Sequence, residues 1–82
     1  MTRLKIPCEN EKKARVLEAL KEIVSGDYSD IDGISIAHDN AWVLLRPSGT
    51  EPYFRITAEG RTKKDLGEII SQARKWLTDA MS

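Results

Sequence analysis

Two arginines, two hydroxyl side chains and a glycine lie within a short segment near the middle of the chain. The segment reads Arg-Pro-Ser-Gly-Thr-Glu-Pro, and its candidate ligand contacts are Arg46, Ser48, Gly49, Thr50 and, shortly after it, Arg55. A phosphate dianion needs several converging donors, and arginine offers a planar fork that bonds two oxygens at once. The hydroxyls add donors, and a glycine lets the backbone approach closely and turn its N–H groups inward. These residue types and their spacing indicate a phosphate-binding loop.

The same segment has a plainer interpretation as a turn. Ser-Gly-Thr between Pro47 and Pro52 is also typical of an ordinary connection between two strands. The prolines fix φ at both positions, which would reduce the entropy lost when a ligand binds to a preformed loop. The residue types alone leave both interpretations open.

Groups that could carry out catalysis are scarce. His38 is the only histidine and is expected near a hairpin, where it would be a solvated surface residue. We expect no histidine or lysine near Ser48 that would activate its hydroxyl as a nucleophile. Acidic residues at Asp27, Asp30 and Asp32 could suggest a metal site, but their spacing matches no calcium loop and is more typical of a solvated loop. We expect no catalytic residue and no metal site within this chain.

The composition excludes several classes of partner. Thirteen basic and thirteen acidic side chains cancel, so no overall field recruits nucleic acid or an anionic membrane. The single cysteine, Cys8, rules out an internal disulfide and is expected to be a structural or surface residue. No apolar run approaches the length of a membrane span, and no signal-peptide pattern opens the chain. We therefore expect a cytoplasmic protein that binds neither nucleic acid nor membrane.

Hydrophobic periodicity predicts two helices. The first begins at about Asn10, with apolar residues at helical spacing up to Val24, and Ser25-Gly26 is a plausible stop. Its polar side is expected to face solvent and consists of Lys12, Lys13, Glu18, Lys21 and Glu22. The second begins after Thr62 as N-cap and continues almost to the C-terminus. Gly67 lies inside this helix at a cost of about 1 kcal/mol relative to alanine, which suggests a close packing contact there.

Three segments of alternating apolar residues and one dense apolar segment predict four strands. They are expected around Leu4 and Ile6 with an end at Pro7, around Ile34 and Ile36 after a loop over 30–33, over 41–46 and over 53–59. Asp39-Asn40 suits a tight hairpin, in which Asn40 can take positive φ. The dense apolar content of 41–46 favours a central strand. Arg55 is expected to point away from the core, because Phe54, Ile56 and Ala58 occupy the other face of their strand.

The order of elements is strand, helix, three strands, helix. Two amphipathic helices can cover one face of a four-stranded, mostly antiparallel sheet, which is a two-layer α+β arrangement. We expect a single domain over residues 1–82.

The segment from Arg46 to Pro52, which follows the apolar run 42–45 and precedes Arg55, resembles the C-terminal domain of the α-D-phosphohexomutases. This family includes phosphomannomutase, phosphoglucomutase and phosphoglucosamine mutase. The resemblance extends to Asp32-Gly33-Ile34 upstream and, downstream, to Ala58-Glu59-Gly60, which leads into the last helix. It therefore covers most of the chain and is weak before about Ile31. It implies the fold already expected, often described as TATA-binding-protein-like. That name concerns shape alone, since neutral net charge and dispersed lysines argue against DNA binding.

The resemblance also implies a function. Such enzymes are isomerases of four domains that move a phosphoryl group between C1 and C6 of a hexose. The phosphorylated serine and the magnesium-binding aspartates lie in the first two domains, and a sugar-reading loop lies in the third. The fourth holds the phosphate that is not transferred. The chain would be this fourth domain, inactive alone, with a hexose phosphate and the remaining domains as partners and with magnesium only in those missing domains.

The family's contacts with the distal phosphate fall at five residues of this chain: Arg46, Ser48, Gly49, Thr50 and Arg55. Glu51 would orient one of the arginines, because a carboxylate has no proton to donate to a dianion. An alternative stays open, in which the chain is a free-standing module of the same fold that captures a phosphorylated metabolite or a partner protein. Which hexose phosphate is bound cannot be read here, because the residues that read hydroxyls and amines would lie in another domain.

Overall fold

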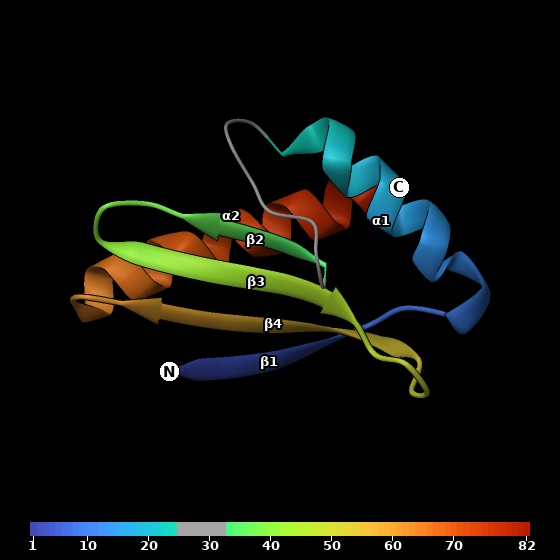
Figure 1. The fold of residues 1–82 in the computed structure, drawn as a ribbon, viewed down its shortest axis with the longest axis horizontal. Helices are drawn as coiled ribbons and strands as arrows, with labels where there is room; N and C mark the ends of the chain where they lie inside the picture. Colours follow the sequence, from blue (N-terminus) through green and yellow to red (C-terminus); the bar gives the residue numbers. More distant parts are fainter. Residues whose placement is uncertain (25–32) are drawn as a thin grey trace.

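Four strands and two α-helices make up the described part of the chain, residues 1–24 and 33–82 of a computed structural model (Figure 1). The elements follow the expected order, with a short 3-10 helix added before the first α-helix. In chain order they are β1 (Thr2–Pro7), η1 (Asn10–Lys12), α1 (Lys13–Ile23), β2 (Ile34–Ala37), β3 (Ala41–Pro47), β4 (Tyr53–Gly60) and α2 (Lys63–Met81). The predicted α+β fold class is confirmed.

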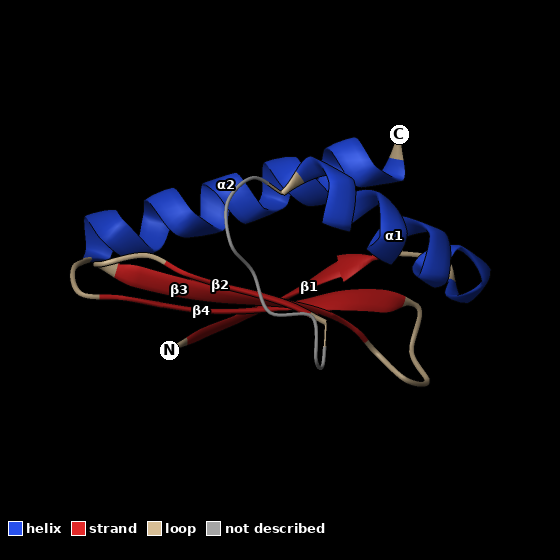
Figure 2. Ribbon diagram, turned by 45° about the horizontal axis from the view of Figure 1, so that its top comes forward, coloured by secondary structure: helices blue, strands red, loops and turns tan. Residues whose placement is uncertain are grey.

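The strands form one sheet in the order β1-β4-β3-β2, and every neighbouring pair is antiparallel. The apolar strand β3 is central, as predicted, and β4 is its central neighbour. Both helices lie over the same face of the sheet (Figure 2). The opposite face carries no helix of the described chain, so side chains that point there lie on an open surface.

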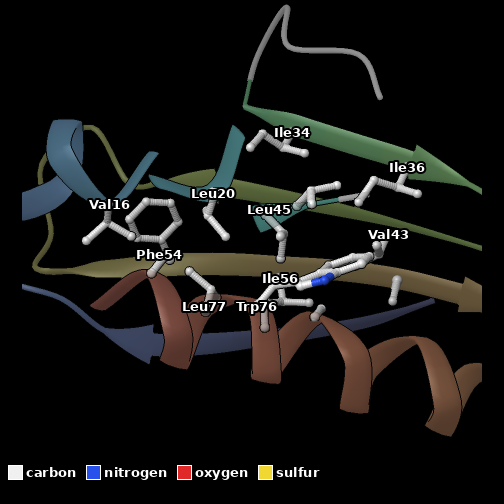
Figure 3. Close-up of a cluster of buried hydrophobic side chains, with 14 of the residues drawn as sticks. Val16, Leu20, Ile34, Ile36, Val43, Leu45, Phe54, Ile56, Trp76 and Leu77 are labelled. Carbon is white, nitrogen blue, oxygen red and sulfur yellow. The ribbon is translucent and has the colours of Figure 1, made fainter. Parts of the chain in front are cut away.

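Alternation along the strands explains which face is covered. In β4, Phe54, Ile56 and Ala58 are fully buried, whereas Arg55 between them is exposed. The cross-strand pair Leu45 and Ile56 is buried under the helices. The largest fully buried side chains come from both helices and three strands: Val16, Leu20, Ile34, Ile36, Val43, Leu45, Phe54, Ile56 and Leu77 (Figure 3). The core thus fixes the register that aims the polar residues of β3 and β4 outward.

The helix boundaries agree with the sequence where the structure describes them. The Thr62 Oγ1 accepts a hydrogen bond from the Asp65 N–H at 3.1 Å, so the predicted N-cap of α2 is confirmed. Helix α1 ends at Ile23. The predicted stop at Ser25-Gly26 and the acidic loop that begins at Asp27 lie outside the described residues.

Two expectations about local backbone are wrong. Gly67 makes no close contact: it is exposed on α2, and an added Cβ would meet nothing within 4 Å. The hairpin at Asp39-Asn40 does form, closed by His38 N–H donating to the Ala41 carbonyl at 2.7 Å. Its residue Asn40 does not take positive φ, since no described non-glycine residue does. A left-handed conformation costs a residue with a Cβ about 1–2 kcal/mol, and this hairpin closes without it.

Gly33 is the glycine whose conformation the fold requires. Its φ is 119°, and a Cβ there would lie 2.4 Å from the Leu45 carbonyl oxygen and 3.1 Å from the Arg46 Cα. Only a glycine lets the chain approach β3 this closely before β2 begins. This close approach is to the backbone of Arg46, the first arginine of the candidate loop.

Candidate phosphate-binding site

The central strands bring the two arginines of the motif together. Arg46 on β3 and Arg55 on β4 are cross-strand partners, one position beyond the buried pair Leu45 and Ile56. Because side chains alternate between faces, both arginines leave the sheet on the open side, and both are exposed. The prediction that Arg55 points away from the core is confirmed. Among the described residues, neither arginine has an ion pair with a carboxylate.

The loop between β3 and β4 is closed by its own hydrogen bonds. The Ser48 N–H donates to the Tyr53 carbonyl at 3.0 Å, and the Tyr53 N–H donates to the Glu51 carbonyl at 2.8 Å. The Glu51 N–H donates to the Ser48 Oγ at 3.1 Å. The Ser48 oxygen therefore accepts one bond within the loop, while its hydroxyl proton can be donated elsewhere.

A hollow opens where the loop meets the arginines. Its volume is about 130 Å³, and it is lined by Arg46, Pro47, Ser48, Gly49 and Arg55. The structure thus gathers four of the five predicted site residues around one cavity. The fifth, Thr50, is exposed on the loop and does not line it. In the described chain, the N–H groups of Gly49 and Thr50 have no hydrogen-bond acceptor, which leaves them available to an anion.

Two larger hollows lie elsewhere on the surface. One of about 560 Å³ lies between the β2–β3 hairpin and α2 and includes Asp39, Asp65 and Glu68. The carboxylates on this hollow would repel phosphate. The other, of about 430 Å³, includes Cys8, Lys12 and Pro52 and is mainly apolar. Of these three hollows of the described chain, the one at the loop is the candidate site, because two guanidiniums and a serine hydroxyl converge on it.

The prediction made for Lys13 from the sequence is wrong. Lys13 was expected on the solvent side of the first helix, but it is only 9% exposed. Its Nζ donates to the Ser48 carbonyl at 2.5 Å and also to the Glu51 carbonyl. Lys13 is the first residue of α1, and its long side chain reaches the loop carbonyls and not water. The expectation that no lysine lies near Ser48 is corrected too, although the ammonium contacts the carbonyl and not the hydroxyl.

The end of β1 fastens the other side of the loop. The Cys8 N–H donates to the Pro52 carbonyl at 2.9 Å. Cys8 is buried, as one of the two expectations for it allowed, and burial raises the pKa of its thiol, with the nearby Lys13 charge opposing that rise. The loop is therefore held to two elements that are distant in the sequence.

Tyr53 and Lys5 join the site from the open face, and the motif did not reveal them. The Arg55 Nη2 donates to the Tyr53 Oη at 3.2 Å, and the Lys5 Nζ lies 5.2 Å from the centre of the tyrosine ring. Lys5 is also the cross-strand partner of Arg55 on β1. The hydrogen bond from Arg55, together with the Lys5 charge, lowers the pKa of Tyr53. The position of Tyr53 beside Arg55 could have been predicted from their two-residue spacing on one strand. The position of Lys5 could be predicted only with the register between β1 and β4.

Glu51 contributes through its backbone. Its N–H and carbonyl both take part in the loop, whereas no ion pair joins its carboxylate to Arg46 or Arg55 in the described chain. His38 is exposed, as expected. Within residues 1–24 and 33–82, no group of three or more His, Cys, Asp and Glu side chains could hold a metal ion. In the same ranges, no helix is both long and apolar enough to cross a membrane.

The sequence pattern described as "Phosphoglucomutase/phosphomannomutase, C-terminal domain" matches residues 4–75 of this chain. The chain belongs to this family. The match includes all five predicted site residues. The prediction made from the motif and its surroundings is thereby confirmed at the level of the family.

Curated relatives agree with this assignment. The chain is 45% identical to the "Probable phosphoglucosamine mutase" of Thermococcus gammatolerans, over 96% of this chain and 19% of that protein. It is 49% identical to the "Probable phosphoglucosamine mutase" of Methanosarcina acetivorans, over 92% of this chain and 17% of that protein. The chain thus spans about a fifth of the length of these relatives.

A solved structure agrees with the phosphohexomutase fold. A phosphoglucomutase/phosphomannomutase family protein from Burkholderia thailandensis superposes with a TM-score of 0.79 over 99% of this chain and 17% of that one. The two are 19% identical in sequence over this match, so the likeness concerns the fold. The two-layer arrangement that carries the loop is therefore that of a phosphohexomutase domain.

Proposed function

We propose that this chain is the C-terminal, substrate-phosphate-binding domain of a phosphohexomutase. Its loop would hold the phosphate of the hexose that is not being transferred, through Arg46, Ser48, Gly49, Thr50 and Arg55. The observation that carries the proposal is the convergence, at one small cavity, of two guanidiniums that have no carboxylate partner among residues 1–24 and 33–82, a serine hydroxyl and the exposed loop amides.

Each group has a separate task in this proposal. Arg46 and Arg55 supply positive charge and bidentate donors from two adjacent strands. The Ser48 oxygen accepts a hydrogen bond from the Glu51 N–H, and the Ser48 hydroxyl proton is donated to the phosphate. The backbone amides of Gly49 and Thr50 complete the ring of donors. The Gly49 position has room for a Cβ within the protein, so the role proposed for this glycine is close approach to the ligand.

A loop that recognises phosphate and little else suits a substrate that must turn round. The phosphoryl group moves between C1 and C6 through a bisphosphorylated intermediate, so either end of the sugar visits this loop in turn. The contribution of the domain is orientation of the substrate and closure over it. We assign the phosphorylated serine and the magnesium to domains of the parent enzyme that this chain does not contain, and no step on these residues requires the metal.

The curated relatives support a narrower proposal for the substrate. Both are named as probable phosphoglucosamine mutases, so we propose that the hexose is a glucosamine phosphate. The residues that would read the amine are expected outside this chain. The loop itself should accept other hexose phosphates equally well.

A chimaera tests the proposal. We would replace the corresponding C-terminal domain of the Thermococcus gammatolerans relative with this chain and measure turnover of glucosamine phosphate, with the unaltered relative as positive control. We expect the chimaera to be active, the same chimaera with Arg46→Gln to lose most of its activity, and the 82-residue chain alone to show none. The proposal is contradicted by a correctly folded chimaera whose activity does not depend on Arg46, or by turnover of the isolated chain that Ser48→Ala abolishes.

A further inference from the structure

The ammonium of Lys13 contacts the phosphate loop from the side of α1, and Lys13 does not line the cavity. Lys13 opens α1, and among the residues that the structure describes it is the only buried polar or charged one. Its Nζ donates to the carbonyls of Ser48 and Glu51. An ammonium is strongly hydrated, and removing it from water is costly unless its protons are bonded. An ordinary turn between two strands does not need a buried cation.

The contact with Ser48 sets the direction of the next amide. No described peptide bond is cis, and in a planar trans peptide the carbonyl and the following N–H point in opposite directions. The Ser48 carbonyl points back to Lys13, toward α1. The Gly49 N–H must therefore point away from α1 and out of the loop. That N–H has no acceptor within the described chain, so it is presented to solvent.

The contact with Glu51 holds the far side of the same turn. Pro52 follows Glu51 and has no N–H, so this second bond fixes the backbone without aiming another donor. Together the two bonds clamp the peptide planes on both sides of Gly49 and Thr50. A single side chain from another element thus pins the part of the loop that carries the candidate amide donors.

We propose that Lys13 is a positioning residue of the phosphate loop, which holds the Ser48 and Glu51 carbonyls from behind and so aims the Gly49 N–H at the ligand. The ligand in this inference rests on the proposed function. The direction of the Gly49 N–H is independent of the proposed function, because it follows from the Lys13 contact and the trans peptide. Lys13 touches neither the phosphate nor the reacting atoms in this account.

Residual dipolar couplings test the direction of the amide. The ¹⁵N-labelled 82-residue chain would be aligned in a dilute medium, and the N–H couplings compared between the unaltered chain and Lys13→Met. Methionine is an unbranched side chain one atom shorter than lysine and has no proton to donate. We expect the Gly49 coupling to change while those of the β4 residues Phe54 and Ile56 are kept. Val16→Ala is the matched control, since it loosens the core from the same helix but leaves the Lys13 contacts.

A titration with inorganic phosphate tests the consequence for binding. We expect Lys13→Met to raise the Kd of the Gly49 amide response about tenfold or more, the factor for one hydrogen bond to a charged group. Val16→Ala should leave it unchanged. Unchanged Gly49 couplings in Lys13→Met, or an unchanged Kd, would overturn the inference. If Lys13→Met does not fold, nuclear Overhauser effects of the unaltered chain decide, because effects between the Gly49 amide proton and protons of α1 would place that N–H toward α1 and overturn the inference by themselves.

The same data separate this inference from the proposed function. If the unaltered chain shows no response to phosphate at Gly49, the proposed function fails, and the ligand named here fails with it. If phosphate binds normally and the Gly49 coupling is the same with and without Lys13, the proposed function stands and only the role of Lys13 is rejected.

Discussion

Arg46 and Arg55 face each other as cross-strand partners on the open side of the sheet, and in the described chain no carboxylate pairs with either. Like charges directly opposite on neighbouring strands destabilise a sheet, by roughly 0.2–1 kcal/mol. Lys5 continues the row on β1 as the partner of Arg55. Three adjacent strands thus present three cations in line. Binding of an anion gives a physical reason for such a row, because the anion cancels the repulsion.

Neutralising one arginine should separate stability from binding. Arg46→Gln removes the repulsion with Arg55, so we expect the free energy of unfolding in urea to rise by a few tenths of a kcal/mol. The same change should abolish the response of the loop amides to phosphate. Arg74→Gln, on the exposed side of α2, removes the same charge at a distance and should change neither quantity. Loss of more than about 1 kcal/mol in Arg46→Gln with intact phosphate binding would make the arginine a structural residue.

Tyr53 should ionise at lower pH than an ordinary tyrosine. The hydrogen bond from Arg55 and the nearby Lys5 charge favour the phenolate and lower the pKa of Tyr53. Tyr28→Phe leaves Tyr53 as the only tyrosine, and absorbance at 295 nm then follows its titration directly. We expect a midpoint below the ordinary value of about 10 in the folded chain. A midpoint at or above that value would show that the Arg55 contact does not persist in solution.

The sign of the linked stability follows from the lowered pKa. The folded chain binds the Tyr53 proton less tightly than the unfolded chain, so ionisation stabilises the fold. This contribution is fully present above about pH 10 and is lost as the pH falls through the lower pKa of the folded state. Urea melts of the unaltered chain and of Tyr53→Phe should therefore diverge on the alkaline side, in favour of the unaltered chain.

Gly67 and Gly60 should respond oppositely to alanine. At Gly67 a Cβ meets nothing within 4 Å, so Gly67→Ala should stabilise α2 by about 1 kcal/mol and raise Tm by roughly 4–8 °C. At Gly60 a Cβ would lie 2.4 Å from the Leu66 nitrogen, and Gly60→Ala should lower stability by about 1–3 kcal/mol. Thermal melts followed by circular dichroism measure both. Equal effects of the two changes would show that the contact between β4 and α2 is looser than described.

Periodicity was sufficient to predict the helices and most strands, because residues such as Leu4 and Ile56 alternate with polar residues and a residue's face is a local property. The strand over 41–46 was predicted from its dense apolar content instead. The motif was sufficient to place Arg46 and Arg55 at one candidate site, since one short loop joins the two strands that carry them. That these residues bind phosphate stays a prediction. Lys13 was placed wrongly because its contact spans 35 positions along the chain. Helical spacing gives the face of a residue on its own helix. It does not show which distant segment, here the loop after β3, packs against the first turn of that helix. Lys5 was missed likewise, because the pairing of β1 with β4 depends on the whole topology.

The central claim is that the loop binds the phosphate of a sugar phosphate. The most direct test is an NMR titration of the ¹⁵N-labelled chain with glucose 6-phosphate, glucose 1-phosphate and free glucose. We expect both sugar phosphates to shift the amides of Ser48, Gly49 and Thr50, with a Kd on the order of 1 mM or weaker, since one dianion in an open site gives only about 4 kcal/mol. Added salt should weaken the response. Arg55→Lys should weaken it as well, because a point charge does not reproduce the bidentate fork. Sugar phosphates that leave these amides unmoved, or free glucose that moves them equally, would contradict the account and make the segment an ordinary turn.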